Sequence, residues 1–362
     1  MKNIAWITAG CFIDVDIDVV PMLSNQFKIS WFILGDINKG DKLRLETIEK
    51  TNNLQIKYCS IKAKWYTPMA FLEYIKHIKE ARRQGELLYV DCGGSLSFYQ
   101  ALDLCSNKDK TILAIHNVKT PKGARFERLA QFNTWYALHR FKNFHTFSKN
   151  QYGYLKSKVS GKNVLESPLM LKDYGRPSVK NNNNVFNFLA FGHIREYKRI
   201  DLLILAAQEL FERTQKRFIV TIAGNCKEWE RYQRLIKYPE LFDLHIEFIE
   251  NEDIPNYFVL ADCLVLPYQD LAQSGAITVA FKYNVPVITS DIEQFVEFNG
   301  NNDYGFRFKS CDVYDLSLVM EKALSLSDIE LQQMKEKQRD FVEKEFSASF
   351  ILKKYKSFID SL

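Results

Sequence analysis

A regular alternation of short apolar runs with longer amphipathic stretches constrains the fold of this chain most strongly. Runs rich in β-branched and aromatic residues predict strands at residues 3–8, 29–34, 55–58, 87–90, 111–115 and 143–147. Helices are predicted between them, including residues 68–83 and 96–105. This alternation is typical of βαβ units, in which helices cover a parallel sheet. We therefore expect an α/β chain of Rossmann-like type.

The alternation restarts after the polar stretch PSVKNNNN at residues 177–184, whose asparagines bury too little apolar surface to fold alone. Beyond it we predict strands at residues 186–191, 218–223, 246–249, 263–267 and 285–289, and helices at residues 199–215, 228–237, 254–260, 275–283 and 328–362. A chain of 362 residues favours two domains. We predict an N-terminal domain at residues 1–170, a linker at 171–184, a C-terminal domain at 185–340, and a helix at 341–362 that packs across the domain junction.

The composition predicts a cytoplasmic protein. No stretch approaches the ~18 uninterrupted apolar residues of a membrane helix. The acids Asp14, Asp16 and Asp18 interrupt the segment where a signal peptide needs an apolar core. The seven cysteines are scattered without the spacing of a zinc site, so we expect them to be reduced.

The two halves of the chain differ in charge. Residues 1–170 carry 25 Lys and Arg against 15 Asp and Glu, whereas the remainder carries 24 against 29. A basic half suggests an anionic partner such as a phospholipid surface, a lipid diphosphate or nucleic acid, and a solvated basic surface without a partner is the alternative. No recognisable nucleic-acid-binding module is present, so we do not expect nucleic acid.

The first candidate site is the turn after the predicted strand FNFLAFG. Ligands of open parallel sheets bind beyond the carboxyl ends of the strands. Gly192 ends this strand, and Arg195 and Lys198 precede the next helix. Two cations at such a turn can reach one diphosphate, and Gly192 lets the backbone approach it. An ordinary basic turn that faces solvent is the alternative.

The second candidate site is in CLVLPYQDLAQSGAITVAFKYNVPVITSD, where a small-residue helix begins after a buried strand and a polar loop. Backbone N–H groups beside Ser274, Gly275 and Ala276 can bind a phosphate with the help of the helix dipole. A simple capped helix with Ser274 as its N-cap is the alternative. Neither a G-x-x-x-x-G-K-[ST] nor a G-x-G-x-x-G motif occurs, which argues against a P-loop enzyme or a conventional dehydrogenase.

Together these segments resemble the retaining glycosyltransferases of family 4, within glycosyltransferase group 1. The matching pieces are FGHIREYKRIDLLILAA at 191–207, TIAGN at 221–225, ADCLVLPY at 261–268, QSGAITVAFKYNVPVITSD at 273–291 and EF at 297–298, with weaker matches at IHNV (115–118) and FSKNQYGYL (147–155). The resemblance implies the GT-B fold, in which two Rossmann-like domains face each other across a cleft. It also implies a nucleotide-sugar donor, a UDP-sugar being favoured, retention of configuration, and neither a metal nor a cofactor.

The resemblance also implies roles for individual residues. Arg195 and Lys198 would stabilise the departing diphosphate, and His116 would face the transferred sugar, although a lone histidine can be merely structural. Asn117 and Lys119 fall on the acceptor side. The implied donor-binding residues are Gly192, Gly224, Asp270, Gln273, Ser274, Gly275, Ala276 and Glu297.

The donor loop departs from the family pattern at two positions. The family has two glutamates separated by seven residues, whereas this chain has Leu271 and Val279 there. Neither side chain can hydrogen-bond a sugar hydroxyl. Asp270 is a candidate substitute for the first glutamate, and Glu297 is a candidate contact to the nucleotide. The donor sugar and base therefore stay open.

A basic, aromatic segment at residues 119–142 is the candidate acceptor surface. Its cations alternate with Phe126, Leu129, Phe132, Trp135 and Tyr136. Such a helix can lie on an anionic membrane, which would imply a lipid-linked glycan acceptor, polysaccharide biosynthesis and a peripheral position at the inner face of the membrane. Alternatively, its aromatic residues are buried in the core and the acceptor is a soluble glycan.

Two other functions stay open beside glycosyl transfer. A nucleotide-sugar epimerase has a similar two-domain plan, but it should bring several carboxylates and histidines to the sugar, and this donor loop has few. A catalytically silent sugar-nucleotide-binding homologue should also have lost its phosphate-binding residues, whereas Gly192, Lys198 and the Ser274-Gly275 turn are present.

Overall fold

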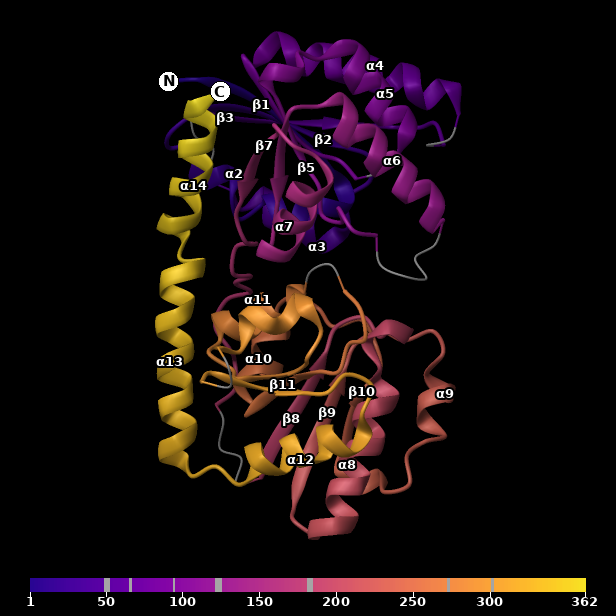
Figure 1. The fold of residues 1–362 in the computed structure, drawn as a ribbon, viewed down its shortest axis with the longest axis vertical. Helices are drawn as coiled ribbons and strands as arrows, with labels where there is room; N and C mark the ends of the chain where they lie inside the picture. Colours follow the sequence, from indigo (N-terminus) through magenta and orange to yellow (C-terminus); the bar gives the residue numbers. More distant parts are fainter. Residues whose placement is uncertain are drawn as a thin grey trace. The chain divides into compact units, whose positions relative to one another are not determined.

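The computed structural model describes residues 1–362 except 49–52, 65–66, 94, 121–125, 181–184, 272–273 and 301–302. It contains two compact units (Figure 1). Unit 1 comprises Met1–Met170 and Phe346–Leu362, and unit 2 comprises Leu171–Glu345. Residues 181–184 of the predicted linker lie outside the described residues.

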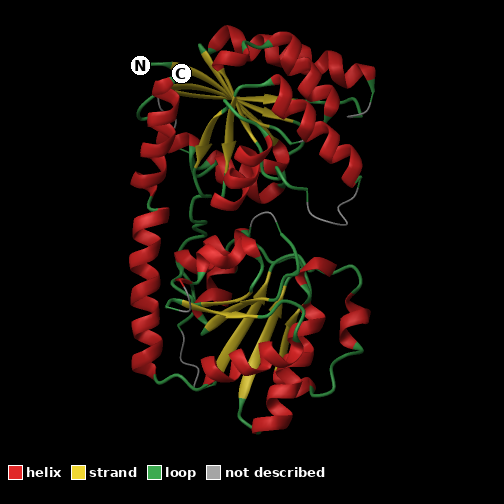
Figure 2. Cartoon of the chain, viewed as in Figure 1, coloured by secondary structure: helices red, strands yellow, loops and turns green. Residues whose placement is uncertain are grey.

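Unit 1 is built on a parallel sheet of seven strands in the order β3-β2-β1-β4-β5-β6-β7 (Figure 2). The inner strands are buried on both faces, which explains their continuous apolar runs. The strands are β1 (Asn3–Ala9), β2 (Lys28–Leu34), β3 (Leu54–Cys59), β4 (Leu87–Asp91), β5 (Thr111–Ala114), β6 (Asn143–Thr146) and β7 (Asn163–Glu166).

Helices cover both faces of this sheet and form two apolar clusters. One cluster includes side chains of α1, α2 and α14, and the other includes side chains of α4, α5, α6 and α7. The helices are α1 (Ile13–Asp16), α2 (Val20–Leu23), α3 (Lys39–Glu46), α4 (Pro68–Gln84), α5 (Leu96–Cys105), α6 (Glu127–Arg140), α7 (Lys149–Lys158) and α14 (Ala348–Ser361), with 3-10 turns η1 (Gly10–Phe12) and η2 (Lys108–Lys110).

The C-terminal helix α14 is part of unit 1. Its apolar stripe of Ile351, Tyr355 and Ile359 is fully buried, and Lys354 pairs with Glu166 at 2.7 Å. The tail was predicted as one continuous helix, but α13 ends at Phe346 and Ser347 caps α14 by accepting a hydrogen bond from the Phe350 N–H. A serine side chain favours a new helix start over continuation of the old helix.

Unit 2 is built on a parallel sheet of six strands in the order β10-β9-β8-β11-β12-β13. Helices α8 and α12 pack on one face of it around a single apolar cluster. The strands are β8 (Phe186–Phe191), β9 (Phe218–Ala223), β10 (Phe242–His245), β11 (Cys263–Leu266), β12 (Val287–Ser290) and β13 (Gly305–Phe308). The helices are α8 (Ile200–Thr214), α9 (Trp229–Gln233), α10 (Ile254–Val259), α11 (Gly275–Lys282), α12 (Val313–Leu324) and α13 (Asp328–Phe346), with 3-10 turns η3 (Glu196–Lys198), η4 (Pro239–Leu241) and η5 (Glu293–Phe298).

Three strands differ from the sequence-based prediction. The strand expected at residues 246–249 is β10, four residues earlier, where Phe242 pairs with Val220. The alternation of apolar and polar residues runs from Phe242 to Phe248, so periodicity alone cannot place the strand within it, and Phe248 is 67% exposed in the structure. The four-residue strands β7 and β13 were missed because such short runs carry little periodicity.

The strand order places the candidate sites. In each sheet, successive strands are first added on one side of the first strand and then on its other side. The strand order therefore reverses between β1 and β4 in unit 1 and between β8 and β11 in unit 2. Ligands of doubly wound sheets bind beyond the carboxyl ends of the strands at such a point. The turns after β8 and β11 meet this condition in unit 2. No described helix has both the length and the apolar character needed to cross a membrane.

Candidate functional site

A cavity of about 220 Å³ lies in unit 2 where the turn after β8 meets the loop between β11 and α11. Both turns were selected from the sequence, and the fold brings them together because β8 and β11 are neighbours in the sheet. The cavity is lined by Lys172, Tyr174, Phe191, Gly192, Tyr197, Lys198, Tyr268, Leu271, Ser274, Gly275, Ala276 and Val279.

Two glycines make the turn after β8 compact. Gly192 has a φ of +95°, and a Cβ added to it would lie 3.3 Å from the Lys198 Nζ. Gly224, at the end of β9, has a φ of +148°, and a Cβ there would lie 2.3 Å from the Gly192 carbonyl oxygen. Side chains at either position would strain the backbone and displace the neighbouring turn. Gly224 therefore shapes the cavity from behind Gly192.

Lys198 is the half-buried cation of this turn. Its Nζ lies 5.3 Å from the ring centroid of Tyr268, a cation–π contact. Burial, and secondarily the charge of Arg195, lowers the pKa of Lys198 to about 8. The protein thus holds an ammonium where its charged form is disfavoured, and an anion in the cavity would reverse that penalty.

Helix α11 begins at the cavity. The Ser274 Oγ accepts a hydrogen bond from the Ile277 N–H at 3.4 Å, so Ser274 is the N-cap of this helix. The alternative of a simple capped helix also predicted this N-cap. The N–H groups of the first turn have no partner within the helix and carry its positive end. Gly275 places no side chain over them. Capping and anion binding are therefore compatible here.

Lys172 is a cavity residue that was not predicted from the sequence. It is only 8% exposed, and its Nζ lies 3.7 Å from the position that a Cβ on Gly275 would take. It belongs to the segment expected to be a linker, so no strand or helix signal drew attention to it. Only its contact with α11, far away in the sequence, reveals it.

The other predicted donor residues that the structure describes do not line the cavity. Arg195 is exposed and acts on the site through its effect on the pKa of Lys198. Asp270 accepts a hydrogen bond from the Leu271 N–H at 2.8 Å, and Glu297 lies in η5, where its carbonyl oxygen accepts from the Tyr304 hydroxyl. Gln273 lies outside the described residues.

Leu271 and Val279 both line the cavity and are 6% and 3% exposed. The two positions that depart from the family pattern thus present an apolar wall. Over the residues that the structure describes, no group of three or more His, Cys, Asp and Glu side chains is arranged to hold a metal ion.

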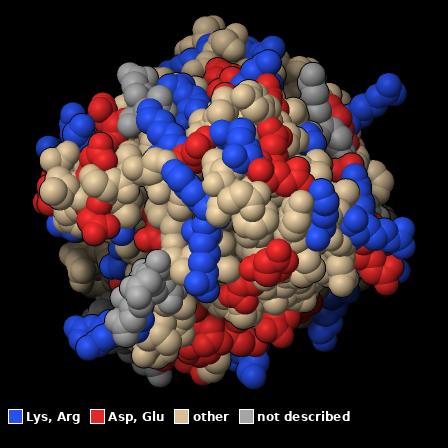
Figure 3. Space-filling view, turned by 90° about the horizontal axis from the view of Figure 1, so that it is seen from below, with Lys and Arg blue, Asp and Glu red and all other residues tan. Residues whose placement is uncertain are grey.

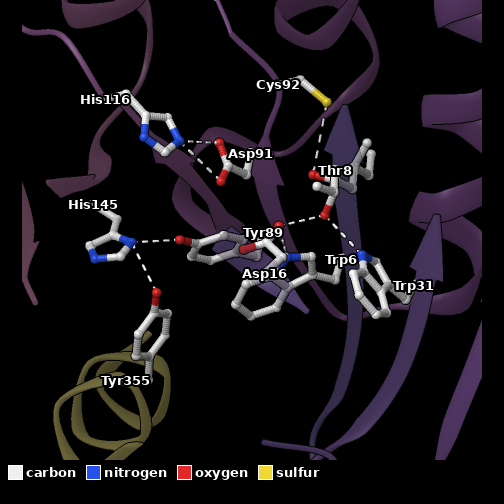
Figure 4. A network of polar contacts seen from close by, with 11 residues as sticks. Trp6, Thr8, Asp16, Trp31, Tyr89, Asp91, Cys92, His116, His145 and Tyr355 are labelled. Atoms are coloured by element: carbon white, nitrogen blue, oxygen red, sulfur yellow. Dashed lines mark hydrogen bonds and ion pairs between the residues drawn. The ribbon is translucent and has the colours of Figure 1, made fainter. Parts of the chain in front are cut away.

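In unit 1, His116 follows β5 and contacts the Asp91 carboxylate (Figure 4) and two aromatic rings. Its Nε2 lies 2.8 Å from an Asp91 oxygen. Its ring stacks against Phe12 at 4.3 Å and against Phe147 at 4.4 Å between centroids. Asp91 is fully buried at the end of β4, so the carboxylate fixes the ring orientation. Sequence reasoning missed Asp91, because its partner is on a neighbouring strand.

Beneath His116 lies a buried polar network that uses Asp16 (Figure 4). The Trp6 Nε1–H donates to Asp16 at 2.8 Å, the Thr8 hydroxyl also donates to Asp16, and the Trp31 Nε1–H donates to Thr8 at 2.8 Å. Burial, reinforced by the negative charge of Asp91, raises the pKa of Asp16 well above its ordinary value. These buried hydrogen bonds explain why Asp16 interrupts the apolar segment near the N-terminus.

A second buried group of this network is His145, at the end of β6. Its Nε2–H donates to the Ser167 carbonyl oxygen at 3.3 Å, which leaves Nδ1 to accept from the hydroxyl groups of Tyr89 and Tyr355. Burial lowers the pKa of His145 to about 3. His145 is thus neutral and links β4 to α14.

The predicted acceptor-side residues Asn117 and Lys119 are exposed. The backbone N–H groups of Val118 and Lys119 donate to the Gln151 Oε1 at 2.8 and 3.1 Å. This contact fixes the turn after β5 to α7. His116, Asn117 and Lys119 therefore form one turn of unit 1.

The aromatic side chains of α6 point outward. Phe132 and Trp135 are 48% and 52% exposed and stack at 5.7 Å between centroids, while Ala137 and Leu138 fill the core instead. The buried-stripe alternative is thus wrong for most of this helix. Phe126 and Leu129 are also exposed, whereas Tyr136 is half-buried and donates to Asp103. Lys122 and Arg125 lie outside the described residues.

Comparisons with known proteins agree with this fold. Residues 174–341 match the model of the family described as Glycosyl transferases group 1. No curated protein sequence matches the chain. Residues 174–341 therefore belong to the glycosyl transferases group 1 family, and the chain has the GT-B fold predicted from its sequence.

Solved structures of low sequence identity share the fold over the whole chain. A glycosyltransferase from Rickettsia africae ESF-5 is 16% identical with a TM-score of 0.77, covering 99% of this chain and 98% of its own. HepE from Anabaena in complex with UDP-glucose is 11% identical with a TM-score of 0.77, covering 100% of both chains. A variant of S. aureus TarM in complex with Fondaparinux, alpha-GlcNAc-glycerol and UDP is 11% identical with a TM-score of 0.67, covering 99% of this chain and 100% of its own.

Proposed function

We propose that the chain is a retaining glycosyltransferase of family 4 that transfers a sugar from a UDP-sugar to a glycan or lipid-linked glycan, without a metal ion. The observation that carries the proposal is the cavity of unit 2. It brings Lys198, Gly192 and the N-terminus of α11 to one point at the switch of strand order. The complexes of HepE with UDP-glucose and of TarM with UDP support a UDP-sugar as donor.

The cavity suits a leaving diphosphate. In the transfer, the bond between the anomeric carbon and the β-phosphate oxygen breaks, and both electrons stay on the diphosphate. The acceptor hydroxyl oxygen bonds to the anomeric carbon and gives up its proton. Lys198 and the first turn of α11 are fixed charges aimed at the oxygen that gains charge, which is the arrangement that lowers such barriers most. These groups do the work that a metal would otherwise do.

Retention requires the acceptor to attack from the face that the diphosphate leaves. A diphosphate oxygen is then the base nearest to the acceptor proton. His116, oriented by Asp91 and clamped between Phe12 and Phe147, is the proposed contact to the transferred sugar. Its rigid ring suits a positioning role because it loses little freedom on binding.

The apolar wall of Leu271 and Val279 restricts how the donor is held. Neither side chain offers a hydrogen bond to a hydroxyl. A hydroxyl placed against them would lose its water without a replacement. The proposed donor, a hexose, is therefore held in this cavity chiefly through its phosphates, and Asp270, next to Leu271, is the candidate carboxylate.

The outward face of α6 supports an acceptor at a membrane. Phe132 and Trp135 offer exposed aromatic surface, and Arg128 on the same helix is exposed. Arg140 is paired with Asp103 at 2.7 Å, so not every cation of the segment is available to lipid. On the face shown in Figure 3, Lys and Arg side chains lie interspersed with Asp and Glu. The proposed membrane contact is localised to α6, at the inner face of the membrane.

The direct test is turnover with a panel of UDP-sugars, with UDP release measured with and without a chelator. We expect slow hydrolysis of at least one donor, unchanged by the chelator, and a loss of about 10- to 100-fold in the Lys198→Ala variant. Proton NMR of a transfer product should show the anomeric configuration of the donor. Binding of UDP without turnover of any donor would instead identify a silent homologue.

A further inference from the structure

Lys172 is a buried lysine that belongs to neither of the two turns selected from the sequence. Its side chain is 8% exposed and lines the same cavity as Lys198. Its Nζ faces the first residue of α11, 3.7 Å from the position of a Cβ on Gly275. An ammonium group at the positive end of a helix dipole is placed where a negatively charged ligand would be attracted by both.

The segment that carries Lys172 is anchored on α11 by other groups. Asp173 pairs with Lys282 at 2.6 Å. The Tyr174 N–H donates to the Tyr283 hydroxyl at 3.1 Å, and that hydroxyl donates to the Gly175 carbonyl oxygen at 2.9 Å. Groups other than the Lys172 ammonium therefore hold the segment against α11.

The cavity concentrates positive charge from three sources. Lys172 and Lys198 each bring an ammonium, and α11 brings the positive end of its dipole. The described residues that line the cavity include no carboxylate. A ligand with two or more negative charges suits a cavity of this kind, and a diphosphate is such a ligand.

We infer that Lys172 is a binding residue for the diphosphate of the donor, and that Lys172 and Lys198 contact it from two walls of the cavity. The inference rests on the proposed function and adds a second cationic ligand to it. Lys198 approaches from the turn after β8, and Lys172 approaches beside the first residue of α11. Lys172, in the segment predicted to be a linker, thereby contributes directly to the donor site.

The experiment is a calorimetric titration of the full chain with UDP and, separately, with inorganic pyrophosphate, which probes the phosphate site without the base. Lys172→Met removes the charge but keeps an unbranched side chain, and Lys172→Arg keeps the charge. Lys282→Met is the matched control, because it removes the ion pair to Asp173 on the same segment without touching the cavity. We expect Lys172→Met to weaken both ligands about 10- to 100-fold, as the loss of a hydrogen bond to a charged group does. Lys282→Met should stay within about threefold of the wild type, and Lys172→Arg, which keeps the charge on a bulkier head group, should lose clearly less affinity than Lys172→Met.

The outcomes separate this inference from the proposed function. If the wild type binds UDP and Lys172→Met binds it equally well, the role of Lys172 is refuted and the proposed function stands. The same holds if Lys172→Arg or Lys282→Met loses as much affinity as Lys172→Met, because the effect would then be structural. If the wild type binds neither UDP nor pyrophosphate, the proposed function fails together with the inference.

Discussion

The pH dependence of UDP binding follows from the position of Lys198. Burial and Arg195 lower the pKa of Lys198 to about 8 in the unliganded protein. A bound diphosphate favours the ammonium and should return its pKa to at least the ordinary value of about 10.4. Protons are then taken up on binding above pH 8, so we expect the affinity for UDP to fall about tenfold between pH 7 and pH 9.

The upper limit of this effect is set by the full shift of the pKa. A shift of about 2.5 units corresponds to roughly 3 kcal/mol, or a few hundredfold in affinity, reached only near pH 10.5. The stability of the folded protein depends on pH with the opposite sign to the affinity for UDP. Below pH 8 the folded protein keeps a charged, half-buried lysine, so its stability should rise as the pH increases from 8 to 10.5, where only the unfolded chain still binds the proton.

Calorimetry at pH values from 7 to 9.5 checks this prediction. The last ionisation of a phosphate lies at about pH 6, so the phosphates of UDP contribute little to the slope over that range. Lys198→Arg is the control, because a guanidinium stays charged throughout and should bind UDP with an affinity nearly independent of pH. An affinity that is constant in the wild type, or that falls equally in Lys198→Arg, would refute the assignment of Lys198 to the phosphate.

Four further predictions concern other parts of the molecule. Gly275→Ala should fold normally, because its Cβ makes only an ordinary contact with Lys172, but it should bind UDP at least tenfold more weakly in calorimetry, since the methyl group covers the first turn of α11. Gly224→Ala should lose roughly 2–4 kcal/mol of unfolding free energy in urea, because the Cβ would clash with the Gly192 carbonyl. His145 takes up a proton only in the unfolded chain between about pH 6.5 and pH 3, so stability should fall as the pH decreases across that window, and the slope measured by urea unfolding should be shallower in His145→Gln. Trp135→Ala should reduce flotation with anionic liposomes while leaving UDP binding intact, and flotation indifferent to anionic lipid would refute the membrane surface.

The turns at the ends of β8 and β11 could be predicted from the sequence because their signals are local. Gly192 ends an apolar run, Lys198 precedes an amphipathic helix, and Ser274 has the residue type of a helix cap. Strand order then brings the two turns together, and the winding rules for parallel sheets make that order expected. Local sequence signals therefore predict the two turns, whereas the GT-B fold was predicted from the resemblance of these segments to a known family.

The remaining features depend on contacts between distant segments. Lys172 lies in a segment without periodicity, and only its position beside Gly275 indicates that it belongs to the candidate site. Asp91 follows a strand like many acids, and only β5 beside it supplies His116. In α6 the periodicity could not decide which face the core would take, since the aromatic residues and the smaller apolar residues form competing stripes.

A crystal structure of the protein with UDP tests the central claim most directly. The account predicts the diphosphate in the cavity of unit 2, with phosphate oxygens within hydrogen-bonding distance of the Lys198 Nζ and of the N–H groups at the start of α11. UDP bound elsewhere, or bound with its phosphates turned away from Lys198 and α11, would contradict it.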